Sequence, residues 1–415
     1  MEIDRISPRR NGHMLMVIPS NLEVVGGKII VDGDFAQYVR LYLEEFESVV
    51  VACTASPQGT FPTREPLDSI PDDGRLKLIV LPEPYREDRY MLKRGTVRRM
   101  LAGEIAKADF VVVAPHSAFD WPTLAAEICQ ETGKPYNMEG DWNLQQVNRS
   151  NWDKLPFGVE KLRRYLWMKY HDPKYFKAMR HSTVALLHGH DVYEAYREIA
   201  PNPQVVNNVC VTEDDRIEPD ALAAKIDGVL TGRPLEIVYA GRAIEMKGPF
   251  EWLRTLIDLR SRGVSYRATW FGEGDLLEPM RAFVRENGLT DTVTIAGKVE
   301  RSTVFEALFK ADIFLFCHLT RESPRNVIEA LAAGAPLIGF GSPFYEHLVT
   351  EHGGGHFVAT GDVAGLSNLV TGLDADRPAL GRLISNAARS GQQFDRTAAV
   401  RRRIALMKQY LLPAA

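Results

Sequence analysis

The chain has 415 residues, of which 45% are hydrophobic and 25% are charged, and its formal net charge is −4. This balance is typical of globular proteins and gives no sign of a nucleic-acid partner, so we expect none. The length exceeds what one hydrophobic core usually supports, which predicts two domains. No run reaches the roughly 18 apolar residues of a membrane span, and the four cysteines form no CxxC pair, which favours a cytoplasmic protein with reduced thiols.

Short apolar runs alternate with helical patterns along the whole chain, which indicates βαβ units and parallel sheets. The strands expected in the first half are LMVIP near residue 15, VVVAC ending at Cys53, LKLIVL from Leu76, FVVVAP from Phe110 and VALLHG from Val184. The pattern loosens between residues 205 and 215, and the alternation starts again at Pro234. We therefore predict an α/β protein with a first domain over residues 1–212 and a second over residues 213–395.

The second half repeats the strand and helix alternation more regularly. Its expected strands are EIVYAG, YRATWFG, TVTIAG, IFLF and PLIGF, and its expected helices span residues 249–262, 276–287, 304–310 and the stretch from Pro324. Ligands of doubly wound sheets bind at the carboxyl ends of the strands. The residues that follow these strands include cations and glycines suited to a diphosphate, namely Arg242, Lys247, Gly272, Gly274 and Lys298.

The segment LTRESPRNVIEALAAG, residues 319–334, carries the most informative pattern. Pro324 predicts the start of a helix, whose free backbone N–H groups attract anions such as phosphate. Glu322 precedes this helix and Glu329 lies inside it. Two carboxylates beside an anion site suggest a sugar nucleotide, although ordinary helix capping explains the same residue types.

These motifs, over roughly residues 234–362, resemble retaining glycosyltransferases of the GT-B fold, family 4. The resemblance implies two Rossmann-like domains that face each other across a cleft, with a nucleoside diphosphate sugar bound by the second. By this resemblance Arg242 and Lys247 bind the diphosphate, Glu329 binds the ribose and Glu322 contacts the donor sugar. The remaining residues expected at the donor site are Gly272, Lys298, Val299, Ser323, Arg325 and Asn326.

Two departures from the family pattern lie in the same segment. Six residues separate Glu322 from Glu329 where the family commonly has seven, and Pro324-Arg325 stands where the family often has an aromatic residue and a glycine. Arg325 fits a phosphate contact and a plain surface position equally well.

The first half resembles the family more weakly. Gly26 and Gly27 resemble the glycine turn that follows the first strand and faces the donor phosphates. His116, at the end of FVVVAP, resembles the histidine near the sugar, while a capping or core histidine is the alternative. The run Glu139-Gly140-Asp141 follows another short apolar segment and is a weaker candidate for the cleft.

The resemblance implies transfer of a sugar to an acceptor hydroxyl with retention of configuration, in bacterial polysaccharide or lipopolysaccharide biosynthesis. The expected catalytic residues are His116, Arg242, Lys247 and Glu322, the acceptor is a carbohydrate or lipid-linked sugar, and neither a cofactor nor a metal is implied. Two alternatives stay open: a catalytically silent subunit that binds nucleotide or a partner protein, and a sugar-nucleotide epimerase.

Four other patterns have simpler explanations or concern the surface. Asp32-Gly-Asp34 has the spacing of a metal motif, but Asp34 as a helix cap explains it. His347, His352 and His356 fit no metal-site spacing. Residues 161–181 are basic and aromatic, which suits either a helix on anionic lipid at the inner face of the cell membrane or a solvated helix. Residues 396–415 predict a final helix that packs back on the first domain.

Overall fold

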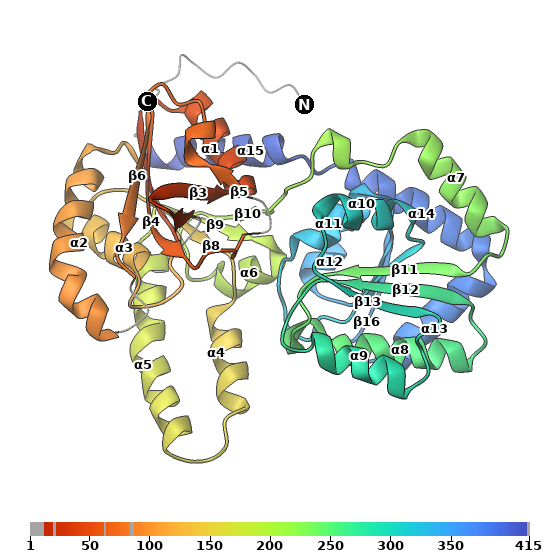
Figure 1. Cartoon of the computed structure of the whole chain (residues 1–415). Coiled ribbons are helices and arrows are strands. Elements are labelled where there is room, and N and C mark those ends of the chain that lie inside the picture. Colours follow the sequence, from red (N-terminus) through yellow and green to blue (C-terminus); the bar gives the residue numbers. More distant parts are fainter. Residues whose placement is uncertain (1–11, 20–21, 62–63, 84–86, 413–415) are drawn as a thin grey trace. The chain divides into compact units, whose positions relative to one another are not determined.

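The computed structural model describes residues 12–19, 22–61, 64–83 and 87–412, and it shows two compact α/β units (Figure 1). The first unit ends at Asn207 and includes the chain again from Val400, and the second spans Asn208–Ala399. Each unit contains a mainly parallel sheet with helices packed on its faces. The predicted fold class, with two Rossmann-like domains, is confirmed.

The sheet of the first unit has seven parallel strands at its centre. They are β1 (His13–Val17), β4 (Ser48–Ser56), β6 (Leu76–Leu81), β7 (Phe110–Val113), β8 (Asn137–Gly140), β9 (Val184–His188) and β10 (Pro203–Val206). Their order is β10-β9-β8-β7-β1-β4, and β6 pairs with β4. Strand β1 lies between β4 and β7, so the strands that follow it along the chain are added to the sheet first on one side of β1 and later on the other. The carboxyl ends of the strands at such a switch point form ligand-binding crevices.

An antiparallel extension of this sheet was not predicted. It consists of β2 (Leu22–Val25), β3 (Lys28–Asp32) and β5 (Arg64–Pro66). Gly26 and Gly27 form the two-residue turn between β2 and β3, with φ of 58° and 79°, which is the conformation that tight hairpins require. Their predicted position after the first strand was wrong, because β2 comes between β1 and the two glycines.

The helix after this hairpin also differs from its predicted start. Helix α1 (Gly33–Glu45) has Asp32 at the N-cap position and Asp34 in its first turn. Asp34 is therefore not the cap itself. An acidic residue in the first turn still interacts favourably with the helix dipole, so the Asp32-Gly-Asp34 pattern belongs to a helix start.

The remaining helices of the first unit are α2 (Glu87–Lys107), α3 (Trp121–Thr132), α4 (Leu144–Asp153), α5 (Val159–Arg180) and α6 (Gly189–Tyr196). Helices α4 and α5 form a hairpin that projects from the body of the unit (Figure 1). The last helix, α15 (Arg396–Leu411), buries Val400, Ile404, Met407 and Leu411 in the core of this unit.

The sheet of the second unit is entirely parallel. Its strands are β11 (Leu235–Ala240), β12 (Tyr266–Phe271), β13 (Val293–Gly297), β14 (Ile313–Phe316), β15 (Leu337–Phe340) and β16 (Gly355–Val358), in the order β13-β12-β11-β14-β15-β16. The switch point therefore lies between β11 and β14. The run IFLF that forms β14 is completely buried, as expected for a central strand covered on both faces.

Helices of the second unit surround this sheet (Figure 1). They are α7 (Pro219–Leu230), α8 (Pro249–Ser261), α9 (Leu277–Glu286), α10 (Arg301–Lys310), α11 (Arg325–Ala332), α12 (Pro343–Leu348), α13 (Val363–Ala375) and α14 (Arg377–Gly391). Across the described parts of both units, we find no helix whose length and apolar content would let it span a membrane.

Candidate functional site

The loops that follow β11 and β14 are packed tightly together at the switch point of the second unit. The backbone N–H of Leu319 donates a hydrogen bond to the carbonyl oxygen of Met246 over 2.8 Å. Gly248 has a φ of 62°, and a Cβ atom added to it would lie 2.0 Å from the carbonyl oxygen of Cys317. Only glycine fits there, so this close approach fixes the neighbouring Lys247 beside the β14 loop.

Lys247 forms an ion pair with Glu322. Its Nζ atom lies 2.6 Å from Oε1 of Glu322, and the two side chains are 8% and 19% exposed. Burial lowers the pKa of Lys247, and the charge and hydrogen bond of Glu322 oppose that effect. The structure thus brings together two residues that the sequence placed on different parts of the donor. Arg242, which also follows β11, is exposed.

His318 belongs to the same cluster and was missed by the sequence analysis. Its ring is completely buried between the hydroxyl groups of Tyr239, 2.8 Å away, and Tyr345, 2.6 Å away. Its Nδ1 atom is 3.4 Å from Oε1 of Glu322. Burial lowers the pKa of His318 well below its usual value, so the ring is neutral. A histidine two residues after the buried run IFLF was the available signal.

Glu329, on α11, interacts with a second pair that was not predicted. Its Oε1 atom is 3.5 Å from the guanidinium of Arg301, which holds Asp215 through two bonds of 2.7 and 2.9 Å. Burial alone would raise the pKa of Asp215, but Arg301 and the backbone N–H of Thr212 outweigh it and lower that pKa. Arg301 is therefore held in place between two carboxylates.

The turn before α11 and the first turn of this helix contain buried polar atoms with no hydrogen-bond partner among the described residues. They are Oγ1 of Thr320, Oγ of Ser323 and Oδ1 of Asn326. The amide nitrogen of Asn326 donates to the carbonyl oxygen of Ala240, and Arg325 donates to Sγ of Cys210. Unpaired buried polar atoms are unfavourable, so their concentration beside Glu322 indicates a site for a polar ligand.

The start of α11 lies one residue later than predicted. Pro324 occupies the N-cap position, and the helix begins at Arg325. The first N–H groups of the helix consequently belong to residues 325–327, close to the turn that carries Glu322.

The residues predicted at the more distant strand ends have other contacts. Gly272 has a φ of 124°, and a Cβ atom on it would lie 2.1 Å from the carbonyl oxygen of Gly241, so the glycine is needed to pack the two loops. The Nζ atom of Lys298 is 3.6 Å from Glu273. Val299 is partly buried against the core of the second unit. Lys298 and Val299 follow β13, two strands from β11.

In the first unit, a cavity of about 260 Å³ lies at the ends of β1, β4 and β7. We call it the small cavity. Its lining includes Ile18, Thr54 and His116, which follow or end these strands, together with Phe119, Trp121 and Trp167. His116 therefore stands at the switch point of the first sheet.

His116 is paired with Asp141. The Nε2 atom of His116 lies 3.4 Å from Oδ2 of Asp141, and its Nδ1 atom lies 3.1 Å from the carbonyl oxygen of Ala114. Burial by itself lowers the pKa of His116, but the hydrogen bond and charge of Asp141 outweigh it and raise that pKa to about 9. Burial likewise opposes the ionised form of Asp141, yet His116 lowers the pKa of this carboxyl to about 2.

The rest of the run 139–141 has a different place. Glu139 and Gly140 lie within strand β8, and Asp141 follows it. The carboxylate of Glu139 bonds to Nε2 of His188 over 2.7 Å and is 4.0 Å from Arg403. Among the contacts described above for these three residues, only that of Asp141 involves a predicted catalytic residue, His116.

We expect replacement of Asp141 by asparagine to lower the pKa of His116 from about 9, because the main effect that opposes burial is removed while only Asp120 and the carbonyl of Ala114 still favour the charged ring. A histidine titration by NMR measures this directly. An unchanged pKa would show that Asp141 does not hold the imidazolium.

The same pair gives a pH dependence of stability. Because folding raises the pKa of His116, its contribution is complete below about pH 6.5 and disappears as the pH rises through about 9. Because folding lowers the pKa of Asp141, its contribution exists above about pH 3.8 and disappears as the pH falls through about 2. The free energy of unfolding of the asparagine variant should therefore vary less over both ranges.

No group of three metal-ligating side chains is found among the described residues. His347 lies in α12, His352 in the turn after it and His356 in β16.

Comparison with known proteins shows that the second unit matches a family of proteins. Residues 220–390 match the family model of glycosyl transferases group 1. This group 1 domain contains β11 to β16 and all the predicted donor-site residues of the second half. A 2-deoxystreptamine glucosyltransferase of Streptomyces kanamyceticus is 26% identical over 179 residues, which are 41% of this chain and 46% of the relative. The chain thus aligns with less than half of that enzyme.

Solved structures extend the similarity in fold to both units. Anabaena Alr3699/HepE, solved with UDP, has a TM-score of 0.66 at 14% identity, covering 95% of this chain and 99% of that one. WaaG, a glycosyltransferase involved in lipopolysaccharide biosynthesis, has a TM-score of 0.64 at 13% identity, covering 95% and 99%. The group 1 domain therefore lies within a chain that has the GT-B fold.

Proposed function

We propose that the protein transfers a sugar from a nucleoside diphosphate sugar to an acceptor hydroxyl. The observation that carries this proposal is the buried ion pair of Lys247 and Glu322 at the switch point of the group 1 domain. Unpaired polar atoms of Thr320 and Ser323 lie in the adjoining turn. A cation, a carboxylate and unsatisfied hydroxyl groups match the diphosphate and hydroxyl groups of such a donor.

In this proposal the diphosphate lies by Arg242, Lys247 and the first N–H groups of α11. Fixed positive charge at that place stabilises the negative charge that develops on the leaving diphosphate. Glu322 accepts hydrogen bonds from the donor sugar, and neutral His318 with its two tyrosines keeps Glu322 in position. Glu329 binds the ribose hydroxyls, and Arg301 orients Glu329.

The acceptor is assigned to the small cavity of the first unit. His116 lies in the wall of this cavity, and because Asp141 holds it protonated it is not a proton acceptor at neutral pH. Aromatic walls from Phe119, Trp121 and Trp167 suit the apolar faces of a sugar ring.

The stereochemistry, the metal requirement and the pathway of the transfer are also proposed. We propose that the anomeric configuration is retained, that the cations make a metal ion unnecessary and that the pathway is bacterial polysaccharide or lipopolysaccharide assembly. NMR of the product gives the configuration, and transfer in the presence of EDTA tests the metal requirement. The general class is supported by a relative that is a glucosyltransferase, a neighbour solved in complex with UDP and glucose, and a neighbour involved in lipopolysaccharide biosynthesis.

Peripheral contact with an anionic membrane surface inside the cell is a further part of this proposal. Leu162 and Tyr165 lie three residues apart along α5 and are 59% and 40% exposed. Basic residues accompany them on the same helix, which is the composition of helices that lie on anionic lipid. Sedimentation with phosphatidylglycerol vesicles, and none with phosphatidylcholine vesicles, is the expected result.

Calorimetric binding and turnover of UDP-, GDP- and ADP-glucose test the central proposal. We expect one nucleotide class to bind and to release nucleoside diphosphate, and Arg242→Ala to weaken both properties because a phosphate contact is lost. Arg267→Ala is the matched control, since Arg267 is also exposed but lies at the opposite end of β12.

Each alternative gives a different result in that experiment. Conversion of the sugar without release of nucleoside diphosphate would indicate an epimerase. Nucleotide binding without any turnover, in the presence of a broad acceptor panel, would indicate a silent subunit. Equal effects of the two arginine variants would contradict the assigned site.

A further inference from the structure

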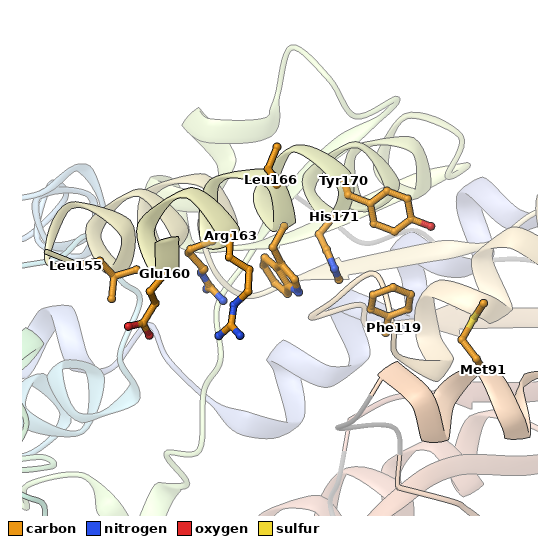
Figure 2. Close-up of a pocket in the computed structure, with 10 residues that line it drawn as sticks. Met91, Phe119, Leu155, Glu160, Arg163, Leu166, Tyr170 and His171 are labelled. Atoms are coloured by element: carbon orange, nitrogen blue, oxygen red, sulfur yellow. The ribbon is translucent and has the colours of Figure 1, made fainter. Parts of the chain in front are cut away.

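A second, larger cavity lies beside the small cavity in the first unit. Its volume is about 1120 Å³, and we call it the large cavity. Figure 2 shows Met91 from α2 and Phe119 on one side of it and residues of α5, including Leu166 and Tyr170, on the other. Phe119 and Trp167 belong to the walls of both cavities. The two cavities are therefore adjacent, with these aromatic rings between them.

Both cavities are lined by apolar and polar side chains, and they differ in which groups of each kind they offer. The small cavity has polar groups from Thr54, His116, Ser117 and Asp120. The large cavity has Met91, Leu155, Leu166 and Trp167, whose side chains offer hydrocarbon surface. A sugar ring needs hydrogen-bond partners that aliphatic side chains lack. The large cavity is accordingly suited to a hydrocarbon chain, and the small one to a hydroxyl-bearing group.

Positive charge accompanies the apolar surface of the large cavity. Arg163 and Arg164 line it, and the Arg164 guanidinium lies 4.3 Å from the centre of the Trp167 ring. The Nζ atom of Lys174 lies 5.2 Å from the ring centre of Phe119, at the junction of the two cavities. Glu160 is the one acidic residue among the lining residues described.

The histidine at the junction does not add to this charge. His171 stacks on Trp167 with ring centres 3.7 Å apart, and burial, Lys174 and Arg164 lower its pKa to about 4. The arginines and Lys174 therefore supply the positive potential, and guanidinium groups suit phosphate well.

We propose that the large cavity binds the hydrocarbon chain of an amphiphilic acceptor whose phosphate lies at Arg163 and Arg164 and whose hydroxyl-bearing end enters the small cavity at His116. This inference rests on the proposed function, because it names the class of acceptor for the same transfer. Charge complementarity and the shared walls of the two cavities decide for this occupant over an uncharged lipid.

A series of alkyl phosphates tests the proposal on the intact, unmodified protein. Butyl, octyl and dodecyl phosphate are titrated by calorimetry, each below the concentration at which it forms micelles. We expect at least about a tenfold gain in affinity from butyl to octyl phosphate, because each additional buried methylene favours binding. Affinity that does not depend on chain length would overturn the proposal.

Two leucines of α5 provide matched variants for the same titration. Leu162 and Leu166 are both 59% exposed, but only Leu166 is among the lining residues of the large cavity. Leu166→Glu should weaken dodecyl phosphate binding at least about tenfold, whereas Leu162→Glu should leave it unchanged. Equal loss in both variants would place the ligand on the outer surface of the helix and overturn the cavity assignment.

A separate pair of variants tests how much the arginine charge contributes to binding of the phosphate group. Arg163→Gln should weaken binding of dodecyl phosphate and leave binding of neutral dodecyl maltoside unchanged, and Lys169→Gln on the same helix should affect neither. Weakening of both ligands by Arg163→Gln would contradict the phosphate position.

Donor turnover by the same protein separates this inference from the proposed function. Release of nucleoside diphosphate without alkyl phosphate binding would overturn the inference and leave the function standing. Alkyl phosphate binding in a protein that uses no donor would overturn the acceptor assignment together with the function.

Discussion

Replacement of Lys247 by methionine should lower the rate of sugar transfer by about 100- to 1000-fold. Lys247 is the buried cation assigned to the diphosphate, and loss of one fixed group that stabilises developing charge typically has an effect of this size. Methionine keeps the length and apolar part of the side chain but removes the charge. The measurement is the rate of nucleoside diphosphate release at saturating donor.

The ion pair makes a second variant necessary. Lys247→Met leaves Glu322 partly buried without its cation. Removal of one partner from a buried ion pair typically lowers the free energy of unfolding by about a few kcal/mol. The double variant Lys247→Met/Glu322→Gln should regain most of the stability and none of the activity. Lys310→Met, which changes an exposed lysine at the end of α10, should be neutral. Activity restored in the double variant would contradict the assigned role of the pair.

Replacement of Glu329 by glutamine should weaken binding of the preferred nucleoside diphosphate by about 10- to 100-fold. A carboxylate accepts hydrogen bonds from both ribose hydroxyls, whereas an amide accepts them at one oxygen, and bonds to charged groups contribute about 1.5–3 kcal/mol. Isothermal calorimetry with the purified variant gives the change.

The 2′,3′-dideoxy form of the same nucleotide makes this result specific. The unmodified protein should bind the dideoxy form more weakly than the ribose form, and Glu329→Gln should bind the two forms alike. Glu306→Gln, on the exposed side of α10, should keep the preference of the unmodified protein. A preference that persists in Glu329→Gln would show that another group reads the ribose.

The fold was predictable where a strand is a continuous apolar run. FVVV and IFLF form β7 and β14 as expected, because central strands of a parallel sheet are covered on both faces. The hairpin of β2 and β3 was not predicted, since each strand is short and lies at the side of the sheet. Strand β8 was missed for a related reason: in its sequence NMEG the methionine stands between asparagine and glutamate, so the strand contains no continuous apolar run.

The site was predictable as a set of strand-end residues but not as a set of contacts. Lys247 and Glu322 could be placed at neighbouring strand ends, yet their pairing depends on the packing of Gly248 against Cys317. Arg301 and Asp215 are 86 residues apart, and neither lies in a recognisable motif. Such long-range pairs follow from how helices and loops pack, which periodicity and spacing along the chain do not record.

The ion pair of Lys247 and Glu322 also bears on how the protein discriminates among the anions of a cell. Because the lysine charge is already balanced by a carboxylate, an inorganic phosphate or sulfate ion would have to displace that carboxylate and leave it uncompensated. A ligand that presents both an anionic group and hydroxyl groups can satisfy the lysine and the glutamate together. The ion pair therefore disfavours the binding of abundant simple anions and favours the binding of molecules that carry both kinds of group.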